Sequence, residues 1–342
     1  LSCSPRILVG MDFYRKLPKI ELHAHLNGSL SNATLAELRE HKYGKEVQLG
    51  TDDGFYKILN GETLSLEECF KKFHYAHDLT DRREALELAT QRVIEDFARD
   101  NVIYLELRTT PKSTAHMPKR EYLSTVLDVI RKSSELHPEI VVKLLPSIDR
   151  SKGIVEAEES VGLAIELDAL YPGLMVGFDL SGNPIGTKFS DFVPALQRAR
   201  SHGFRMALHC GEFDDVQEVK EMLDFGMDRI GHGTFIEGEN LEFAKKSRIP
   251  FECCLTSNVK CETVPSYEEH HFYKMLKMKQ PTDDFGVFET SLSQELEICA
   301  KTFNLSDDEM FELQQNTIEY TFANDQEKHK LRETLRKFKE SR

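Results

Sequence analysis

The chain has 342 residues, 40% of them hydrophobic and 30% charged, with a net charge of −14. This composition is typical of a globular protein with a large core, and the negative charge argues against a nucleic acid polymer as a partner. No run approaches the roughly 18 apolar residues of a membrane span, the N-terminus lacks the pattern of a signal peptide, and seven scattered cysteines predict a reducing, cytoplasmic location.

Short runs of apolar and β-branched residues alternate with longer helical patterns along the chain. The predicted strands cover residues 19–25, 102–108, 140–149, 174–182, 204–212, 229–233, 250–258 and, more weakly, 280–284. Helical patterns are clearest at 83–100 and at 190–203, where Gly203 is a stop signal. The basic tail at 328–342 has the apolar spacing of an amphipathic helix.

Alternating strands and helices predict a parallel sheet, and eight strands would close a (β/α)8 TIM barrel. A miscount by one strand would leave a doubly wound sheet as the alternative. The barrel is favoured because nearly every predicted strand ends in reactive polar residues, which is the pattern that one site at the C-terminal strand ends would leave. These residues are His23, His25, Arg108, Thr109, Asp149, Asp179, Gly182, His209, Glu212, His232, Ser257, Asn258, Asp283 and Asp284. We expect one domain over residues 1–342, with helical pieces between residues 34 and 74 covering the active-site mouth.

Three histidines and a carboxylate point to a metal site. His23 and His25 lie two apart on a predicted strand, so both side chains face the same side. His-x-His alone is weak evidence, since histidines are also common in cores and on surfaces. With His209 in "LHCGE" and Asp283 in "TDDFG", the set suits Zn²⁺ with one position left for water.

Two further residues are candidates for proton transfer. Glu212 follows His209 by three residues, where it could exchange a proton beside a zinc-bound water, although a surface carboxylate is the alternative. His232 stands between two glycines in "RIGHG" and either orients that water, takes its proton, or is a core histidine. The segment "TDDFG" has two interpretations. Asp283 could bind the metal while Asp284 faces the substrate, or the segment could be a simple turn rich in Asp and Gly.

The segments "LHAHLNGS", "LHCGE", "RIGHG", "CLTSN", "TDDFGVF" and "SLSQE" occur in an order that resembles the adenosine/AMP deaminase family, across residues 19–295. The resemblance implies a (β/α)8 barrel with one zinc ion per chain. It assigns the metal to His23, His25, His209 and Asp283, with His25 also lining the substrate site. It further implies that Glu212 donates a proton to purine N1, that His232 is a water-orienting base, that Asp284 contacts N7 and that the Gly182 backbone meets N3.

Within this family the chain is similar to the adenosine deaminase-like members, which implies conversion of N6-methyl-AMP to IMP and methylamine. The alternative is an adenosine or AMP deaminase that releases ammonia. Asn27 stands where nucleoside deaminases usually carry an aspartate that contacts the ribose 5′-hydroxyl. A carboxylate ~4 Å from a phosphate would cost about 4 kcal/mol per charge pair at an effective dielectric near 20. Asn27 therefore indicates a phosphorylated substrate, or it only shapes an Asn-Gly turn.

The loop "LRTTPK" offers Thr109, Thr110, Pro111 and Lys112 as a phosphate cradle. His77 and Asp149 are ribose-phosphate contacts by resemblance alone. The family's apolar strand before Asp283 looks about four residues short here, either through a shortened strand or through omitted residues.

Two other classes remain open. A two-metal amidohydrolase is disfavoured because "DLSGNP" has no bridging lysine, and a zinc- or purine-binding protein without turnover is disfavoured because Glu212 and His232 are present. We expect a monomer that binds a small purine nucleotide and no membrane.

Overall fold

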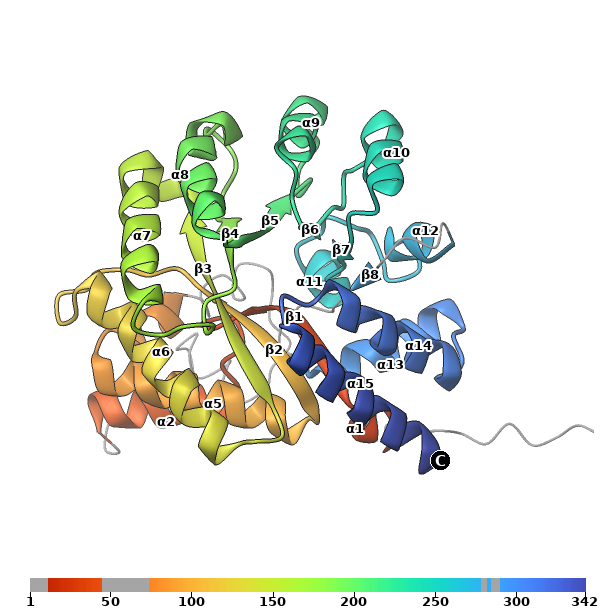
Figure 1. Ribbon diagram of the computed structural model, residues 1–342, viewed down its shortest axis with the longest axis horizontal. Coiled ribbons are helices and arrows are strands. Elements are labelled where there is room, and N and C mark those ends of the chain that lie inside the picture. The colour runs from red at the N-terminus through yellow and green to blue at the C-terminus, as the bar shows by residue number, and fades with distance from the viewer. Residues whose placement is uncertain (1–11, 45–73, 278–281, 284–289) are drawn as a thin grey trace, which may run out of the picture.

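The computed structural model describes residues 12–44, 74–277, 282–283 and 290–342. Eight strands form one sheet in chain order through seven parallel pairings, with helices on the outer side (Figure 1). The strands are β1 Lys19–His25, β2 Val102–Thr109, β3 Val141–Asp149, β4 Gly177–Ser181, β5 Arg205–Cys210, β6 Arg229–His232, β7 Phe251–Glu252 and β8 Thr282–Asp283. Parallel pairing in sequence order confirms the predicted (β/α)8 barrel and excludes the doubly wound alternative.

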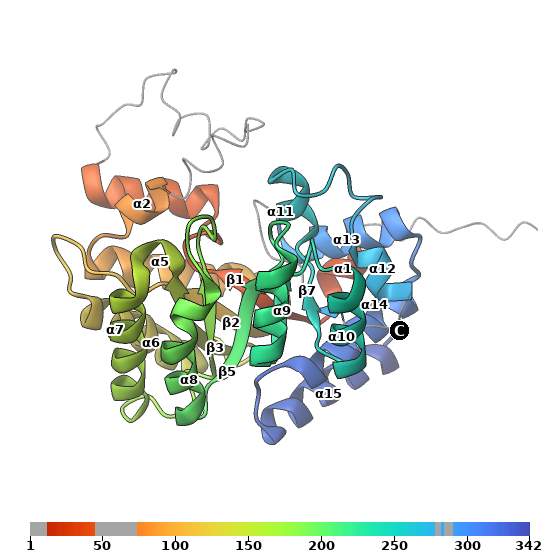
Figure 2. The ribbon, with the colours of Figure 1, turned by 90° about the horizontal axis from the view of Figure 1, so that it is seen from above.

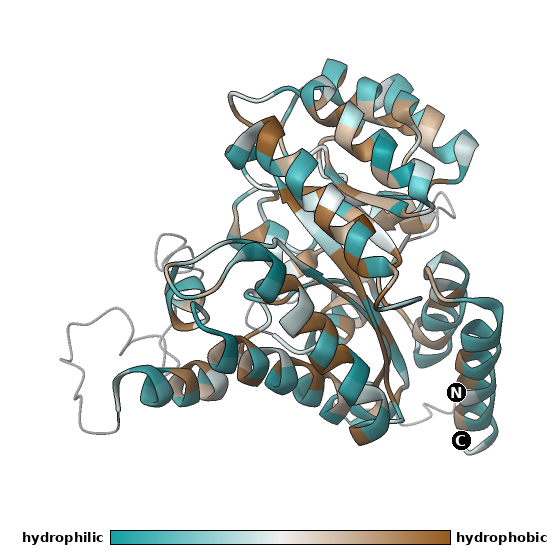
Figure 3. Cartoon of the chain, turned by 60° about the vertical axis from the view of Figure 1, so that its left-hand side comes forward, coloured by the Kyte–Doolittle hydropathy of each residue, from teal (hydrophilic) through white to brown (hydrophobic). Residues whose placement is uncertain are grey.

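The helices bury apolar faces against the strands and turn polar faces outward (Figure 3). They are α1 Asp12–Lys16, α2 Asn32–Tyr43, α5 Arg83–Arg99, α6 Lys119–Leu136, α7 Gly153–Asp168, α8 Phe189–His202, α9 Val216–Phe225, α10 Gly238–Ser247, α11 Leu255–Lys260, α12 Phe272–Lys277, α13 Leu292–Phe303, α14 Asp307–Thr317 and α15 Asp325–Glu340, with 3-10 turns at Arg150–Lys152 and Ile318–Tyr320. Among the described helices, none combines the length and apolar character needed to cross a membrane.

Most predicted elements are confirmed within one to three residues. Helix α8 ends where Gly203 adopts a left-handed conformation, as its stop signal predicts. The basic tail forms α15 and buries Leu331 and Leu335 against the core. Helix α2 lies beside α5, where Arg92 forms a two-armed ion pair with Glu37 (Figure 2). The rest of the predicted mouth cover, at 45–73, lies outside the described residues.

The predicted strand at 250–258 is wrong in its second half. Only Phe251–Glu252 forms β7, and Ser257 and Asn258 lie on helix α11. The backbone N–H of Asn258 donates to the backbone carbonyl of Cys254 over 2.9 Å, as in a helical turn. A short buried apolar run reads alike as strand or helix, which explains the error. Of the weak strand at 280–284, only Thr282–Asp283 is described.

A chain of buried ion pairs crosses the barrel interior. Arg229 forms ion pairs with Glu106 and with Glu252, and the Glu252 pair is 2.6 Å long. Arg108 forms ion pairs with Glu252 and with Asp179, and the Asp179 pair is 3.3 Å long. All five side chains are fully buried. Burial alone would raise the pKa of Glu252, but the two guanidinium groups outweigh it and lower that pKa. The glutamate therefore stays ionised inside the barrel.

Removing one member of this chain leaves uncompensated buried charge. We expect Arg229→Met to lower the free energy of unfolding by about 3–5 kcal/mol, because Glu106 and Glu252 lose their shared partner. Arg205→Met is the matched control, since Arg205 forms an exposed pair with Asp228 and its loss should cost about 1 kcal/mol or less. Urea denaturation measures both, and equal losses would contradict a structural role for the buried chain.

Candidate metal centre and substrate site

The predicted histidines come together at the C-terminal ends of β1, β5 and β6. The ring of His23 lies 4.7 Å from that of His209 and 4.9 Å from that of His232, between ring centres. The Nε2 atoms of His25 and His209 are 3.2 Å apart. Four imidazoles from three strands therefore surround one point at the end of the barrel.

Buried carboxylates fix which nitrogen each of two histidines presents to that point. His23 donates from Nδ1 to Glu252 over 2.7 Å, and His209 donates from Nδ1 to Asp179 over 2.7 Å. Each ring must then carry its lone pair on Nε2, which is the form that binds a metal. Burial would raise the pKa of Asp179, but His209 and Arg108 lower it far below its ordinary value, so this carboxylate is ionised.

The donor set fits a divalent metal. Two groups have donor atoms within 4.8 Å of one another: His23 with His209 and His232, and His25 with Asp179 and His209. Asp179 already accepts from His209 and Arg108, so we place it outside the ligand set. The lone pair that His209 carries on Nε2 faces Nε2 of His25 over 3.2 Å, so a cation between the two rings could be bound by both nitrogens.

The backbone of Asp283 lies at the same end of the barrel as the histidines. Strand β8 pairs with β7 in a register that sets Asp283 beside Glu252, which itself contacts His23. Asp284 lies outside the described residues. Residues 278–281 do too, so the choice between a shortened strand and omitted residues before Asp283 stays a prediction.

Glu212 and His232 form a pair beside the histidines. Their closest atoms, Oε1 of Glu212 and Nε2 of His232, are 3.6 Å apart, and the glutamate is about one-third exposed. His232 has a left-handed backbone with φ 61°, which is rare outside glycine. The next residue must be glycine, because Gly233 has φ +69° and a Cβ there would meet Phe251 at 2.4 Å. The motif "RIGHG" thus ends strand β6 in a left-handed turn at His232 and Gly233, which aims one imidazole.

A second polar cluster lies two residues beyond His25. Nδ1 of His77 is 3.1 Å from Nδ2 of Asn27 and 2.7 Å from Nζ of Lys112. Asn27 also donates to Thr80 over 3.2 Å. Burial, then Lys112, lowers the pKa of His77 to about 4, and burial lowers the pKa of Lys112 to about 8. Two donors thus converge on one nitrogen acceptor.

The remaining predicted contacts separate into two groups. The Thr109 hydroxyl bonds Tyr122 on α6 over 2.7 Å, so it faces the helix layer and not the cluster. Thr110 is half-buried and Pro111 is buried in the loop that carries Lys112. Asp149 lies against Gly182, where φ is +84° and a Cβ would stand 2.2 Å from Oδ1 of Asp149. Only glycine fits there, and its exposed backbone is available to a ligand.

Comparison with known proteins identifies the family. The adenosine deaminase family matches residues 18–338. The chain is 47% identical to an adenosine deaminase-like protein of Drosophila melanogaster, over 92% of this chain and 94% of that protein. It is 42% identical to the N6-methyl-AMP deaminase of Homo sapiens, over 94% and 93%. The chain belongs to the adenosine deaminase family.

Solved structures agree with this membership. The crystal structure of the Arabidopsis N6-mAMP deaminase MAPDA matches with a TM-score of 0.85 and 42% identity, over 95% of this chain and 99% of that chain. Membership of the adenosine deaminase family confirms the predicted class of enzyme, a metal-dependent hydrolytic deaminase acting on a purine C–N bond. It leaves the metal's identity and the substrate to be argued from the site.

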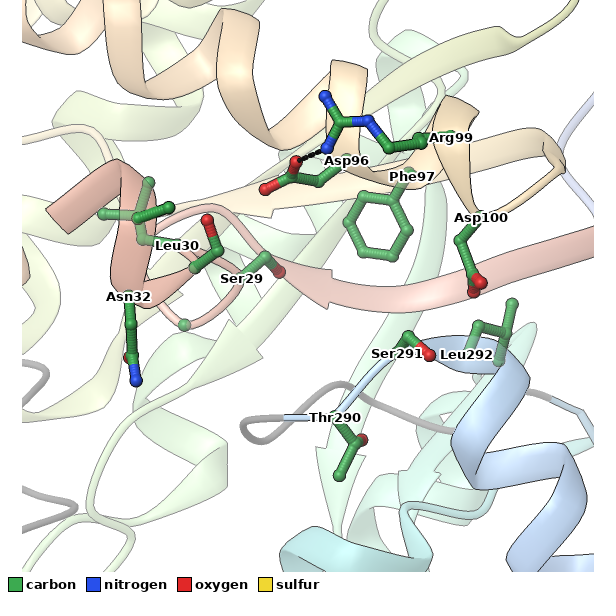
Figure 4. A pocket seen from close by; sticks show the side chains of 13 residues that line it. Ser29, Leu30, Asn32, Asp96, Phe97, Arg99, Asp100, Thr290, Ser291 and Leu292 are labelled. Carbon is green, nitrogen blue, oxygen red and sulfur yellow. Dashed lines mark hydrogen bonds and ion pairs between the residues drawn. The ribbon is translucent and has the colours of Figure 1, made fainter. Parts of the chain in front are cut away.

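A cavity of about 510 Å³ lies elsewhere on this adenosine deaminase family member, between the loop after β1, helix α5 and the start of α13 (Figure 4). Asp96, Phe97 and Asp100 line it, and none of the clustered histidines does. Its described lining offers no group of imidazoles, so we take the histidine cluster as the candidate site.

Several residues that build the site escaped the sequence reasoning. Glu252, His270 and His271 contact the predicted histidines or their partners. Arg108, Asp179 and Asn258 were recognised only as polar strand ends. A glutamate within the apolar run "PFECCL" and the pair "HH" were the available signals.

Asp179 gives a test of how carboxylates tune the histidines that could hold a metal. We expect Asp179→Asn to weaken metal binding about 10- to 100-fold, because His209 loses the charge that orients it and raises its basicity. Asp228→Asn is the control, since Asp228 also accepts from an arginine, Arg205, but does not contact the histidine cluster. Competition against a chelator measures the affinity, and equal metal retention in both variants would contradict the assignment.

Proposed function

We propose that the chain is a zinc-dependent deaminase of a 6-aminopurine 5′-monophosphate, converting N6-methyl-AMP to IMP and methylamine. The observation that carries the proposal is the cluster of Asn27, His77 and Lys112, two residues beyond the metal-facing His25. Relatives named N6-methyl-AMP deaminase, and an Arabidopsis ADAL structure complexed with IMP at 40% identity, support the same substrate class.

Two donors of this cluster compete for one ring nitrogen, although Asn27 also donates to Thr80 and Lys112 to the His77 backbone carbonyl. The lone pair of His77 Nδ1 is approached by both the Asn27 amide and the Lys112 ammonium, and one nitrogen cannot satisfy both fully. A phosphate brings several acceptor oxygens and a charge of about −1.5 to −2. It would therefore satisfy the competing donors and hold the ribose end of a nucleotide beside the barrel mouth.

His23, His25, His209 and Asp283 would hold one zinc ion. When bound, zinc lowers the pKa of its water to about 7 and supplies hydroxide for attack at purine C6. The choice of zinc is supported by three imidazoles and one carboxylate, a ligand set that this metal favours.

The chain's own residues would orient the purine and move a proton. Glu212, half-buried beside His232, is the proposed proton donor to purine N1, which lets the ring carry charge as the C6 substituent leaves. We propose His232 as the group that orients the attacking oxygen. The Gly182 backbone would meet purine N3, and Asp284 would contact N7. Asp149 is proposed as a ribose-phosphate contact, and it lies close enough to His77 for its charge to raise the pKa of that ring.

A four-substrate assay tests the proposal. We expect the highest kcat/KM with N6-methyl-AMP, lower values with AMP, and the lowest with N6-methyladenosine and adenosine. Release of methylamine and formation of IMP identify the reaction. Faster turnover of adenosine than of either monophosphate would overturn the substrate assignment, and faster turnover of AMP would make the enzyme an AMP deaminase.

Asn27 gives the sharpest change of substrate choice. We expect Asn27→Asp to lower the ratio of kcat/KM for N6-methyl-AMP over N6-methyladenosine by about tenfold or more, because the new carboxylate repels the phosphate and pairs with Lys112 itself. Asn32→Asp adds the same charge nearby, at the start of α2, and serves as the control. An unchanged ratio would show that Asn27 only shapes the turn.

The pH dependence of that ratio reports on Lys112. Its pKa of about 8 means that the ammonium is charged below this pH and loses its charge above it. We expect the monophosphate-to-nucleoside ratio to fall as the pH rises through about 8, and Lys112→Arg to remove the fall because a guanidinium stays charged. The two substrates share the metal centre, so its titration cancels in the ratio. A wild-type ratio that is flat through this range would contradict the assignment.

A further inference from the structure

We infer that a directed chain of hydrogen bonds from helix α12 through His270 and Asn258 fixes the tautomer of His232, so that its Nε2 carries the proton and faces the active site as a donor. Asn258 and His270 are thereby positioning residues for the reaction. The inference deepens the proposed function and depends on it only for which oxygen receives the hydrogen bond.

The chain begins at a group that can only donate. The backbone N–H of Phe272 points to Nδ1 of His270 over 3.0 Å. That nitrogen must therefore accept, and His270 must carry its proton on Nε2. Burial, followed by the neighbouring His271 and His232, lowers the pKa of His270 to about 2 against an opposing backbone contact with Cys254, which agrees with a neutral ring.

The protonated nitrogen of His270 orients the Asn258 amide. His270 Nε2 lies 3.1 Å from Oδ1 of Asn258, and only an oxygen can accept there. The other end of the amide, Nδ2, therefore faces Nδ1 of His232 at 3.3 Å and the Thr234 hydroxyl at 3.2 Å, and as a donor it offers no lone pair to either. The contacts of Thr263 agree with this orientation. Its hydroxyl donates to the backbone carbonyl of Asn258 over 3.1 Å, so the same oxygen is left to accept from Nδ2 of the Asn258 side chain over 3.0 Å.

An imidazole nitrogen that faces an NH₂ group has no room for a proton of its own. Nδ1 of His232 must be bare, and the ring's proton sits on Nε2. That nitrogen points toward Oε1 of Glu212, 3.6 Å away. The ring is also held through its backbone, because His271 donates from Nε2 to the His232 carbonyl over 2.8 Å.

The consequence is a change in the role of His232. A ring with its proton on Nε2 donates a hydrogen bond to the attacking oxygen or to Glu212. It has no lone pair on that side with which to take a proton. His232 thus orients the nucleophile as a donor, and the base role implied by family resemblance does not fit its surroundings.

Nitrogen NMR of histidine rings tests the tautomer directly. Metal-containing protein labelled with ¹⁵N-histidine should show, at neutral pH and without substrate, a His232 ring protonated on Nε2 only, with its signals identified by their absence in His232→Gln. A proton on Nδ1 in the wild-type protein would overturn the inference. This result stands or falls whichever purine the enzyme deaminates.

Asn258→Asp tests the cause. An aspartate keeps the shape and still accepts from His270, but it offers His232 only an acceptor, so we expect a proton to appear on Nδ1 of His232 and kcat to fall at least tenfold with a smaller change in KM. His271→Gln is the matched control, because His271 stacks on His270 and contacts the His232 backbone and the Cys253 thiol rather than the His232 ring nitrogens, and the tautomer should persist. An unmoved tautomer in Asn258→Asp would contradict the positioning role, as would a moved tautomer with unchanged kcat.

Discussion

Buried ionic contacts inside the barrel are the constraint on which the site depends. Glu252 and Asp179 are each shared between an arginine in the barrel and a histidine at its mouth. A buried carboxylate is costly unless paired and hydrogen-bonded, and Arg108 supplies that pairing to both. The same two carboxylates then fix the tautomers of His23 and His209. Fold stability and metal-binding geometry thus draw on the same side chains.

The histidines around the site are differentiated by what faces their second nitrogen. His23 and His209 meet carboxylates at Nδ1, so each presents a lone pair at Nε2. His232 meets an amide N–H₂ at Nδ1, so it presents a proton instead. Identical side chains are therefore set up differently: two present a lone pair that suits a metal, and one presents a proton. The difference lies in the group that faces Nδ1 of each ring.

The sequence predicted the barrel and the polar residues at the C-terminal ends of its strands well, because strand periodicity and polar strand ends are local patterns. The strand at 19–25 is confirmed residue for residue. Asn258 was expected at a strand end and lies on a helix, since a short apolar run suits either element. Glu252 and His270 act through partners far away in the chain, and no local spacing connects them to His23 or His232. Those contacts exist only after the barrel has formed.

One measurement tests the central claim that a single metal held by these histidines serves a phosphorylated purine. A crystal structure of the zinc-loaded protein with IMP should show one ion on His23, His25, His209 and Asp283, with the phosphate against Lys112, His77 and Asn27. A second bridged metal would contradict the claim. So would a phosphate bound away from that cluster.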